Sequence, residues 1–180
     1  MDLFLTQWMT LVVVFSLALI SPGPDFVIAV RNAIVYSKRV GILTAAGFAC
    51  GVLVHVTYTV FGIAAIIAQS VIVFNMIKWA GAAYLAYIGF KALRSEGMGQ
   101  KAIDDATRAD KPIDASLGDF TAFRTGFLTN LLNPKASLFF LAIFSQIIKP
   151  ETPFVWQCVY GLTCALMCFG WFSVVTLVLN

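Results

Sequence analysis

The most constraining feature of the sequence is the break Pro22-Gly23-Pro24, followed directly by Asp25, inside an apolar run of residues 3–30. Neither proline has a backbone N–H, glycine adopts backbone angles that other residues avoid, and a residue before proline is pushed out of the helical region. Broken backbone at membrane depth is tolerated only where protein surrounds it or where it lines a wet cavity. The segment therefore predicts a discontinuous helix with an ionisable group at the break, the usual construction of a transporter substrate site.

A second break of similar chemistry lies in the other half of the chain. Asn130, Asn133, Pro134 and Lys135 interrupt an apolar run of residues 120–148, and again a charge directly follows a proline. Pro24 and Pro134 are 110 residues apart, and the charges that follow them have opposite sign. This pairing indicates an internal repeat with the two breaks at matching positions.

Composition places the chain in the membrane. Of its 180 residues, 60% are hydrophobic and 12% are charged, and the mean hydropathy is +0.88, whereas about 25% of the residues of a soluble domain are charged. The net charge of +3 is divided among short loops, so we expect no nucleic-acid partner. Cys164 and Cys168 share a helix face, but with no His or carboxylate near them we interpret them as packing residues and expect no metal and no cofactor.

The apolar runs predict an all-α, polytopic membrane helix bundle. Gly47 and Gly51 form a small-xxx-small face that allows a neighbouring helix to come close. The polar segment 94–119 separates a first unit, residues 1–93, from a second, residues 120–180. Segments 31–39 and 91–124 hold nine of the twelve Lys and Arg residues, which predicts an outside N-terminus and a cytoplasmic 94–119 loop. The predicted spans are residues 3–20 continued by 26–36, then 40–68, 71–93, 120–148 and 154–179.

Three motifs carry a family resemblance: Ser21-Pro-Gly-Pro-Asp-Phe26, Trp79-Ala-Gly-Ala-Ala-Tyr-Leu85, and Gly126-Phe-Leu-Thr-Asn-Leu-Leu-Asn-Pro-Lys-Ala136. In this order and spacing the chain resembles the LysE/RhtB family of amino-acid exporters, particularly the homoserine/threonine exporter branch. The resemblance implies a bacterial inner-membrane carrier that expels neutral amino acids by proton antiport. It also implies two inverted three-helix repeats whose broken first helices face each other.

The resemblance implies that the motif residues of both breaks bind the substrate. A sixth helix expected from the family does not follow residue 180. This leaves open a truncated or shifted reading frame, a helix supplied by another subunit, and a non-transporting membrane subunit or remnant. A homodimer is left open as well. The residues that match the family motifs are Pro22, Gly23, Pro24, Asp25, Asn130, Asn133, Pro134 and Lys135.

An amino acid carries a carboxylate and an ammonium, so its site needs a positive and a negative feature close together. Half-helix N-terminal N–H groups or Lys135 can bind the carboxylate, and Asp25 with freed carbonyl groups can bind the ammonium. The alternative is that Asp25 and Lys135 neutralise each other in a structural ion pair, because a lone charge in the bilayer costs about 2.5–3.5 kcal/mol on insertion scales. The sequence leaves both interpretations open.

His55, near the middle of the second predicted span, is a candidate proton relay together with Asp25, since imidazole titrates near neutral pH. A hydrogen-bonded packing role is the alternative for such a lone histidine. Asp25 and His55 could in principle serve an intramembrane enzyme, but no nucleophile pair, metal motif or phosphate loop accompanies them. We therefore expect a transporter whose partners are an amino acid, protons and the lipid bilayer, and not an enzyme.

Overall fold

The computed structural model describes residues 2–93, 104, 117–149 and 151–180. Most of the predicted 94–119 loop therefore lies outside the described residues. Within the described part every long element is a helix, which confirms the all-α class. The helices are α1 (Asp2–Ile20), α2 (Pro24–Val35), α3 (Lys38–Gln69), α4 (Val71–Leu93), α6 (Asp119–Leu131), α7 (Pro134–Ile147) and α8 (Phe154–Leu179).

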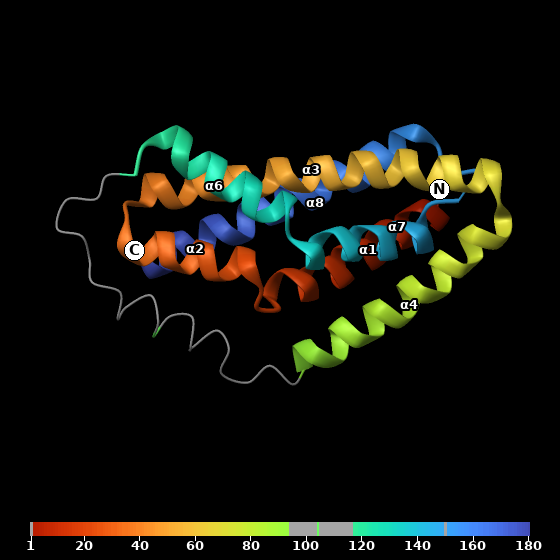
Figure 1. Cartoon of the computed structure of the whole chain (residues 1–180), viewed down its shortest axis with the longest axis horizontal. Helices are drawn as coiled ribbons and strands as arrows, with labels where there is room; N and C mark the ends of the chain where they lie inside the picture. Colours follow the sequence, from red (N-terminus) through yellow and green to blue (C-terminus); the bar gives the residue numbers. More distant parts are fainter. Residues whose placement is uncertain (1, 94–103, 105–116, 150) are drawn as a thin grey trace.

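Both predicted breaks are present, and the two broken pairs run in opposite directions along the bundle. In Figure 1, α1 and α2 lead from right to left, whereas α6 and α7 lead from left to right, with α3 and α8 beside them. The axes of α6 and α7 differ by 57°. Among the described residues, four helices are long and apolar enough to cross a membrane, and α6 with α7 makes a fifth if counted as one bent span. The structure thus has the polytopic helical bundle that the sequence predicts.

Proline sets the start of each second half-helix. Pro24 and Pro134 occupy the first turn of α2 and α7, where a missing N–H costs no helical hydrogen bond. Asn133 caps α7, since its side-chain oxygen accepts from the backbone N–H of Lys135 at 3.0 Å, whereas Gly23 caps α2 without a side-chain bond. Because proline favours this position, α2 begins two residues earlier than the predicted continuation at residue 26.

Glycine allows α3 and α6 to touch backbone to backbone. A Cβ placed on Gly47 would lie 2.2 Å from the carbonyl oxygen of Phe123, and one on Gly126 would lie 2.1 Å from that of Thr44. A Cβ on Gly51 would lie 2.6 Å from the side-chain oxygen of Asn130. No side chain fits at such distances, so the prediction of a close helix contact at Gly47 and Gly51 is confirmed.

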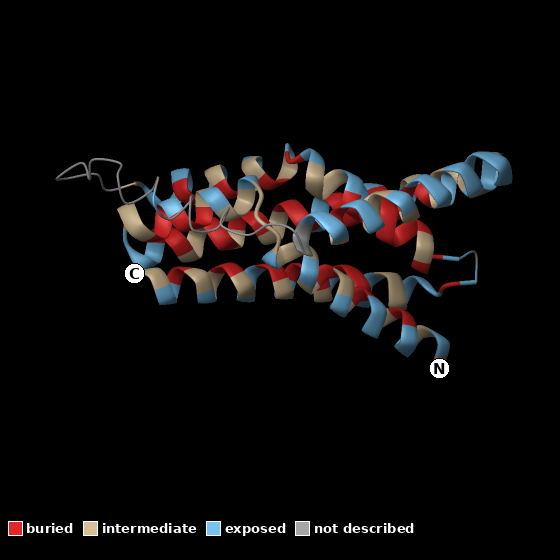
Figure 2. Ribbon diagram, turned by 90° about the horizontal axis from the view of Figure 1, so that it is seen from below, coloured by how far each residue is buried: buried red, intermediate tan, exposed pale blue. Residues whose placement is uncertain are grey.

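The core is aromatic and lies between the broken pairs and α3 and α8. Phe15 contacts Phe139 and Phe140 with ring centroids 5.6 and 5.5 Å apart, and Phe48 contacts Phe172 at 4.8 Å. Figure 2 shows buried residues along the inner faces of the helices and exposed ones along the outside. The outside carries many large apolar side chains, as expected for a surface that faces lipid.

Helix α4 packs mainly against α7, with smaller contacts to α3 and α1. At the crossing with α7, a Cβ on Gly81 would lie 2.9 Å from the Cα of Ala142. The side-chain amide of Gln146 donates to the carbonyl oxygen of Lys78 at 2.6 Å. Gly81 thus allows α4 to pack closely against the broken helix α7.

Candidate functional site

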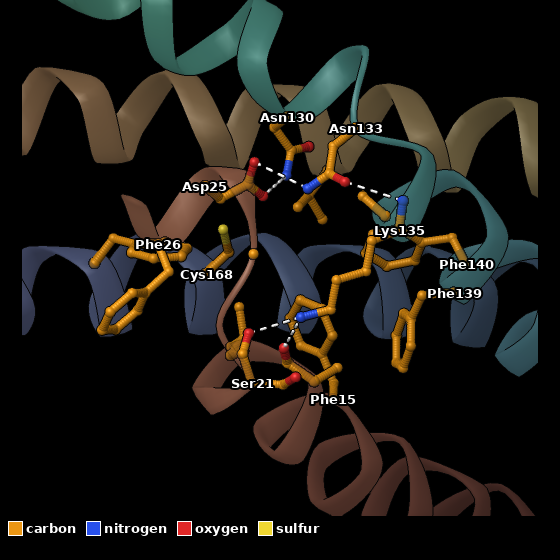
Figure 3. A pocket seen from close by; sticks show the side chains of 16 residues that line it. Phe15, Ser21, Asp25, Phe26, Asn130, Asn133, Lys135, Phe139, Phe140 and Cys168 are labelled. Atoms are coloured by element: carbon orange, nitrogen blue, oxygen red, sulfur yellow. Dashed lines mark hydrogen bonds between the residues drawn. The ribbon is translucent and has the colours of Figure 1, made fainter. Parts of the chain in front are cut away.

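The two breaks meet and line one cavity in the middle of the bundle (Figure 3). Of the eight predicted binding residues, five line this cavity: Gly23, Asp25, Asn130, Asn133 and Lys135. The three prolines are not among its lining residues, and their contribution is to interrupt the helices. The structure thus brings together the polar residues of two segments that lie more than 100 positions apart.

Asp25 is held by two neutral donors from the other break. The side-chain amide of Asn130 donates to one carboxylate oxygen at 2.7 Å, and that of Asn133 donates to the other at 3.1 Å. Asn130 and Asn133 are 2% and 4% exposed, so both bonds are screened from water. Asp25 also lies in the first turn of α2, where the helix dipole favours a negative charge. These contacts orient the carboxylate without neutralising it.

Lys135 extends from the start of α7 to the end of α1. Its ammonium donates to the carbonyl oxygens of Ser21 at 2.7 Å and Ala18 at 3.2 Å. In a continuous helix the carbonyl of Ala18 would accept from residue 22, which is a proline and has no N–H. The positive charge therefore satisfies carbonyl groups that the proline break leaves without a backbone donor.

Asp25 and Lys135 do not form a direct ion pair in this conformation. An ion pair within 4.0 Å does join Arg39 and Asp119, at 2.5 Å and at the exposed starts of α3 and α6. The charges of Asp25 and Lys135 are instead bound separately, by amide groups and by backbone carbonyls. The cavity thus has a negative and a positive feature, each held by groups of no net charge.

His55 is fully buried, and its ring bonds to a carbonyl that has lost its helical donor. Its Nε2 lies 2.9 Å from the carbonyl oxygen of Asn130, which in a continuous helix would accept from residue 134, a proline without an N–H. The same oxygen also accepts from the backbone N–H of Asn133 at 3.0 Å. A carbonyl only accepts, so Nε2 carries the hydrogen, and in the neutral imidazole Nδ1 accepts from the hydroxyl of Tyr58 at 2.5 Å. His55 is not among the residues that line the cavity, and it contacts Asn130 from outside.

Sequence reasoning did not single out the apolar wall of the cavity. Helix α8 contributes Cys168 and Phe172, and the break-bearing helices contribute Phe15, Phe139 and Phe140. The cavity leaves the centre of a water-sized molecule about 50 Å³ in which to move, so it has room for water. The spans are evenly apolar, so their sequence does not show which faces point inward. Ala18 could have been found from the sequence. A helical carbonyl accepts from the N–H four residues later, and the residue four positions after Ala18 is Pro22, which has no N–H.

These features define the class of the protein as a polytopic helical membrane protein with a polar pocket between two broken, oppositely directed helices. The family follows from comparison: the model of the LysE type translocators matches residues 16–180. The chain belongs to the LysE type translocator family. The resemblance inferred from the three motifs is thereby confirmed.

Several curated relatives are about one third identical to the chain. The uncharacterized membrane protein YrhP of Bacillus subtilis is 33% identical over 74% of the chain and 64% of its own length. The homoserine/homoserine lactone efflux protein of Salmonella typhimurium is 30% identical over 81% of the chain and 66% of its length. The threonine efflux protein of Escherichia coli is 32% identical over 80% of the chain and 68% of its own length. The match thus covers a little under two thirds of the length of YrhP, and no solved structure matches.

Proposed function

We propose that the chain exports small neutral amino acids, of the homoserine and threonine kind, from the bacterial cytoplasm across the inner membrane in exchange for protons. The observation that carries the proposal is that one cavity holds Asp25 from one break and Lys135 from the other, without a direct ion pair between them. Relatives named as homoserine and threonine efflux proteins support this substrate class.

A zwitterion suits a cavity of this design. The carboxylate of the substrate would bind the ammonium of Lys135 and the free N–H groups at the starts of α2 and α7. The substrate's ammonium would bind Asp25, which Asn130 and Asn133 hold in place. The rest of the wall has five phenylalanines and no further charged side chain. The site therefore favours an uncharged side chain.

Asp25 also suggests how export is coupled to protons. A carboxylate binds either a proton or the ammonium of a substrate, so the two would occupy Asp25 in turn. We propose His55 as the second member of this relay, although it must release Tyr58 or Asn130 in order to pass a proton. The outside N-terminus, which the basic loops indicate, belongs to the same proposal. So does the division into repeats at 1–93 and 120–180, which the two breaks and the polar segment between them indicate.

The proposal is tested with purified protein in liposomes loaded with labelled threonine or homoserine. A proton gradient directed into the liposomes should accelerate efflux, and Asp25→Asn should abolish the acceleration while the protein remains inserted. The matched control is Asp119→Asn, which neutralises an exposed carboxylate and should leave efflux unchanged. Wild-type rates of gradient-driven efflux in Asp25→Asn would contradict the proposed function.

A further inference from the structure

The carbonyl groups at the end of α1 form an acceptor site of their own. The backbone oxygens of Ala18 and Ser21 both point to the ammonium of Lys135. Pro22 removes the N–H that would otherwise satisfy Ala18, and the C-terminal end of a helix carries a partial negative charge. A broken helix therefore presents converging, negatively polarised oxygens at membrane depth.

We propose that the carbonyl oxygens of Ala18 and Ser21 form a binding site for a primary ammonium group. In this conformation the ammonium of Lys135 occupies the site. When an amino acid enters, Lys135 turns to the substrate's carboxylate, and the substrate's own ammonium takes its place on the carbonyls before or after it contacts Asp25. This second step rests on the proposed function, whereas the existence of the ammonium site does not.

The geometry around Lys135 allows such an exchange. Lysine is a compact charge on a flexible four-carbon stem and has three donors and no acceptor, so two carbonyl oxygens leave one N–H free. The side chain runs over Gly23: a Cβ on Gly23 would lie 3.3 Å from Cδ and 3.4 Å from Nζ of Lys135. A Cβ at position 23 would make a tight contact with the lysine stem. Glycine therefore leaves the stem room to turn.

The size of the cavity gives a reason for the exchange. The centre of a water-sized molecule can move in only about 50 Å³ of the cavity, which is little space for threonine with its eight non-hydrogen atoms. The stem of Lys135 itself lines the cavity, so turning it aside enlarges the space. The carbonyls of Ala18 and Ser21 would then be left without a donor, which is costly away from water. The ammonium of the substrate would remove that cost, so that binding and the movement of Lys135 favour each other.

The test removes the ammonium of Lys135 by substitution and supplies a small ammonium ion in solution. Methylammonium chloride is titrated into purified Lys135→Ala, and thermal unfolding is followed in detergent. Methylammonium should raise the melting temperature saturably, by about 2–4 °C, with no comparable rise for the wild type, whose site is filled. Tetramethylammonium, which has no N–H, controls for ionic strength and should have no saturable effect. Equal responses to the two cations would overturn the proposal.

Two further arms sharpen the result. In Pro22→Ala combined with Lys135→Ala, residue 22 regains an N–H for the carbonyl of Ala18, and the methylammonium effect should shrink. Stabilisation by sodium chloride equal to that by methylammonium would show a metal-ion site instead and would also overturn the proposal. If Lys135→Ala does not fold, methylammonium is titrated into Lys135→Gln instead, whose side-chain amide can donate to one of the two carbonyl oxygens. A rise in melting temperature no larger than that of the wild type would again reject the site.

The outcome is separable from that of the proposed function, because the titration measures stabilisation by an amine and not transport. Saturable stabilisation by methylammonium in a protein that binds no amino acid would retain the ammonium site and reject the exporter proposal. Threonine binding without a methylammonium effect would retain the exporter and reject the site.

Discussion

Substituting Gly126 by alanine should force α3 and α6 apart. The new Cβ would lie 2.1 Å from the backbone oxygen of Thr44, whereas ordinary contacts begin at 3.4 Å, so the helices must separate by about 1.3 Å because backbone cannot rotate away. Overpacking of this kind costs about 1–3 kcal/mol. That exceeds the about 0.5–1 kcal/mol gained when alanine replaces glycine in a helix, so the net effect is destabilising.

The same separation would reach the candidate site. Helix α3 carries His55, whose bond of 2.9 Å to the carbonyl oxygen of Asn130 joins α3 to the break after α6. A displacement of about 1.3 Å exceeds the range over which a hydrogen bond persists. Gly126→Ala should therefore release Asn130, which orients Asp25, and reduce efflux by more than its loss of stability explains.

The measurement is thermal unfolding of purified variants in one detergent, with efflux from liposomes as the second readout. The matched control is Gly62→Ala on α3, because a Cβ there meets no atom within 4 Å. Gly126→Ala should lower the melting temperature by about 2–4 °C for each kcal/mol lost, while Gly62→Ala should leave it unchanged or raise it slightly. Equal melting temperatures for the two variants would refute the close packing of α3 on α6.

Three further predictions concern contacts elsewhere in the bundle. His55→Leu removes the imidazole donor to the carbonyl of Asn130 and should lower the free energy of unfolding by about 0.6 kcal/mol, at most about 1.7. His55→Gln keeps a donor and should stay stable while losing proton-driven efflux. A wild-type pH profile of efflux in the stable glutamine variant would contradict the relay. Tyr160→Phe removes a hydroxyl that contacts the carbonyl of Phe4 and the side chain of Gln7 at 3.1 and 3.0 Å, and faster proteolysis near the N-terminus should report the loosened α1; an unchanged cleavage rate would count against this role. Arg39→Ala should lower the melting temperature by no more than about 4 °C, because exposed ion pairs contribute little to stability. A larger drop would show that the pair is more than a surface contact.

Much of the fold could be predicted because proline and apolar length act locally. Residues 71–93 and 154–179 were predicted as spans with the bounds that α4 and α8 have. Both breaks are predictable because Pro24 and Pro134 lack the backbone N–H that would continue the preceding helix. The close contact at Gly47 was likewise found from a spacing of small residues.

The contacts within the site could not be predicted, because they depend on how distant segments meet. Asp25 and Lys135 were recognised as a possible ion pair, but the sequence does not show that amides hold one charge and carbonyls the other. His55 was recognised as polar within a span, whereas its partner, the backbone of Asn130, carries no sequence signal except the proline four residues later. Such backbone acceptors are found by asking which carbonyl loses its helical donor to a proline four residues later.

The most direct test of the central claim is equilibrium binding of labelled threonine and homoserine to the purified protein, with Asp25→Asn compared with the wild type. If the two breaks form an amino-acid site, the wild type binds at least one of the two ligands. Loss of a charge-assisted contact worth about 1.5–3 kcal/mol should then weaken binding by about tenfold or more in Asp25→Asn. Equal affinity in the two proteins, or no binding by the wild type, would contradict the claim that the cavity between the breaks binds amino acids.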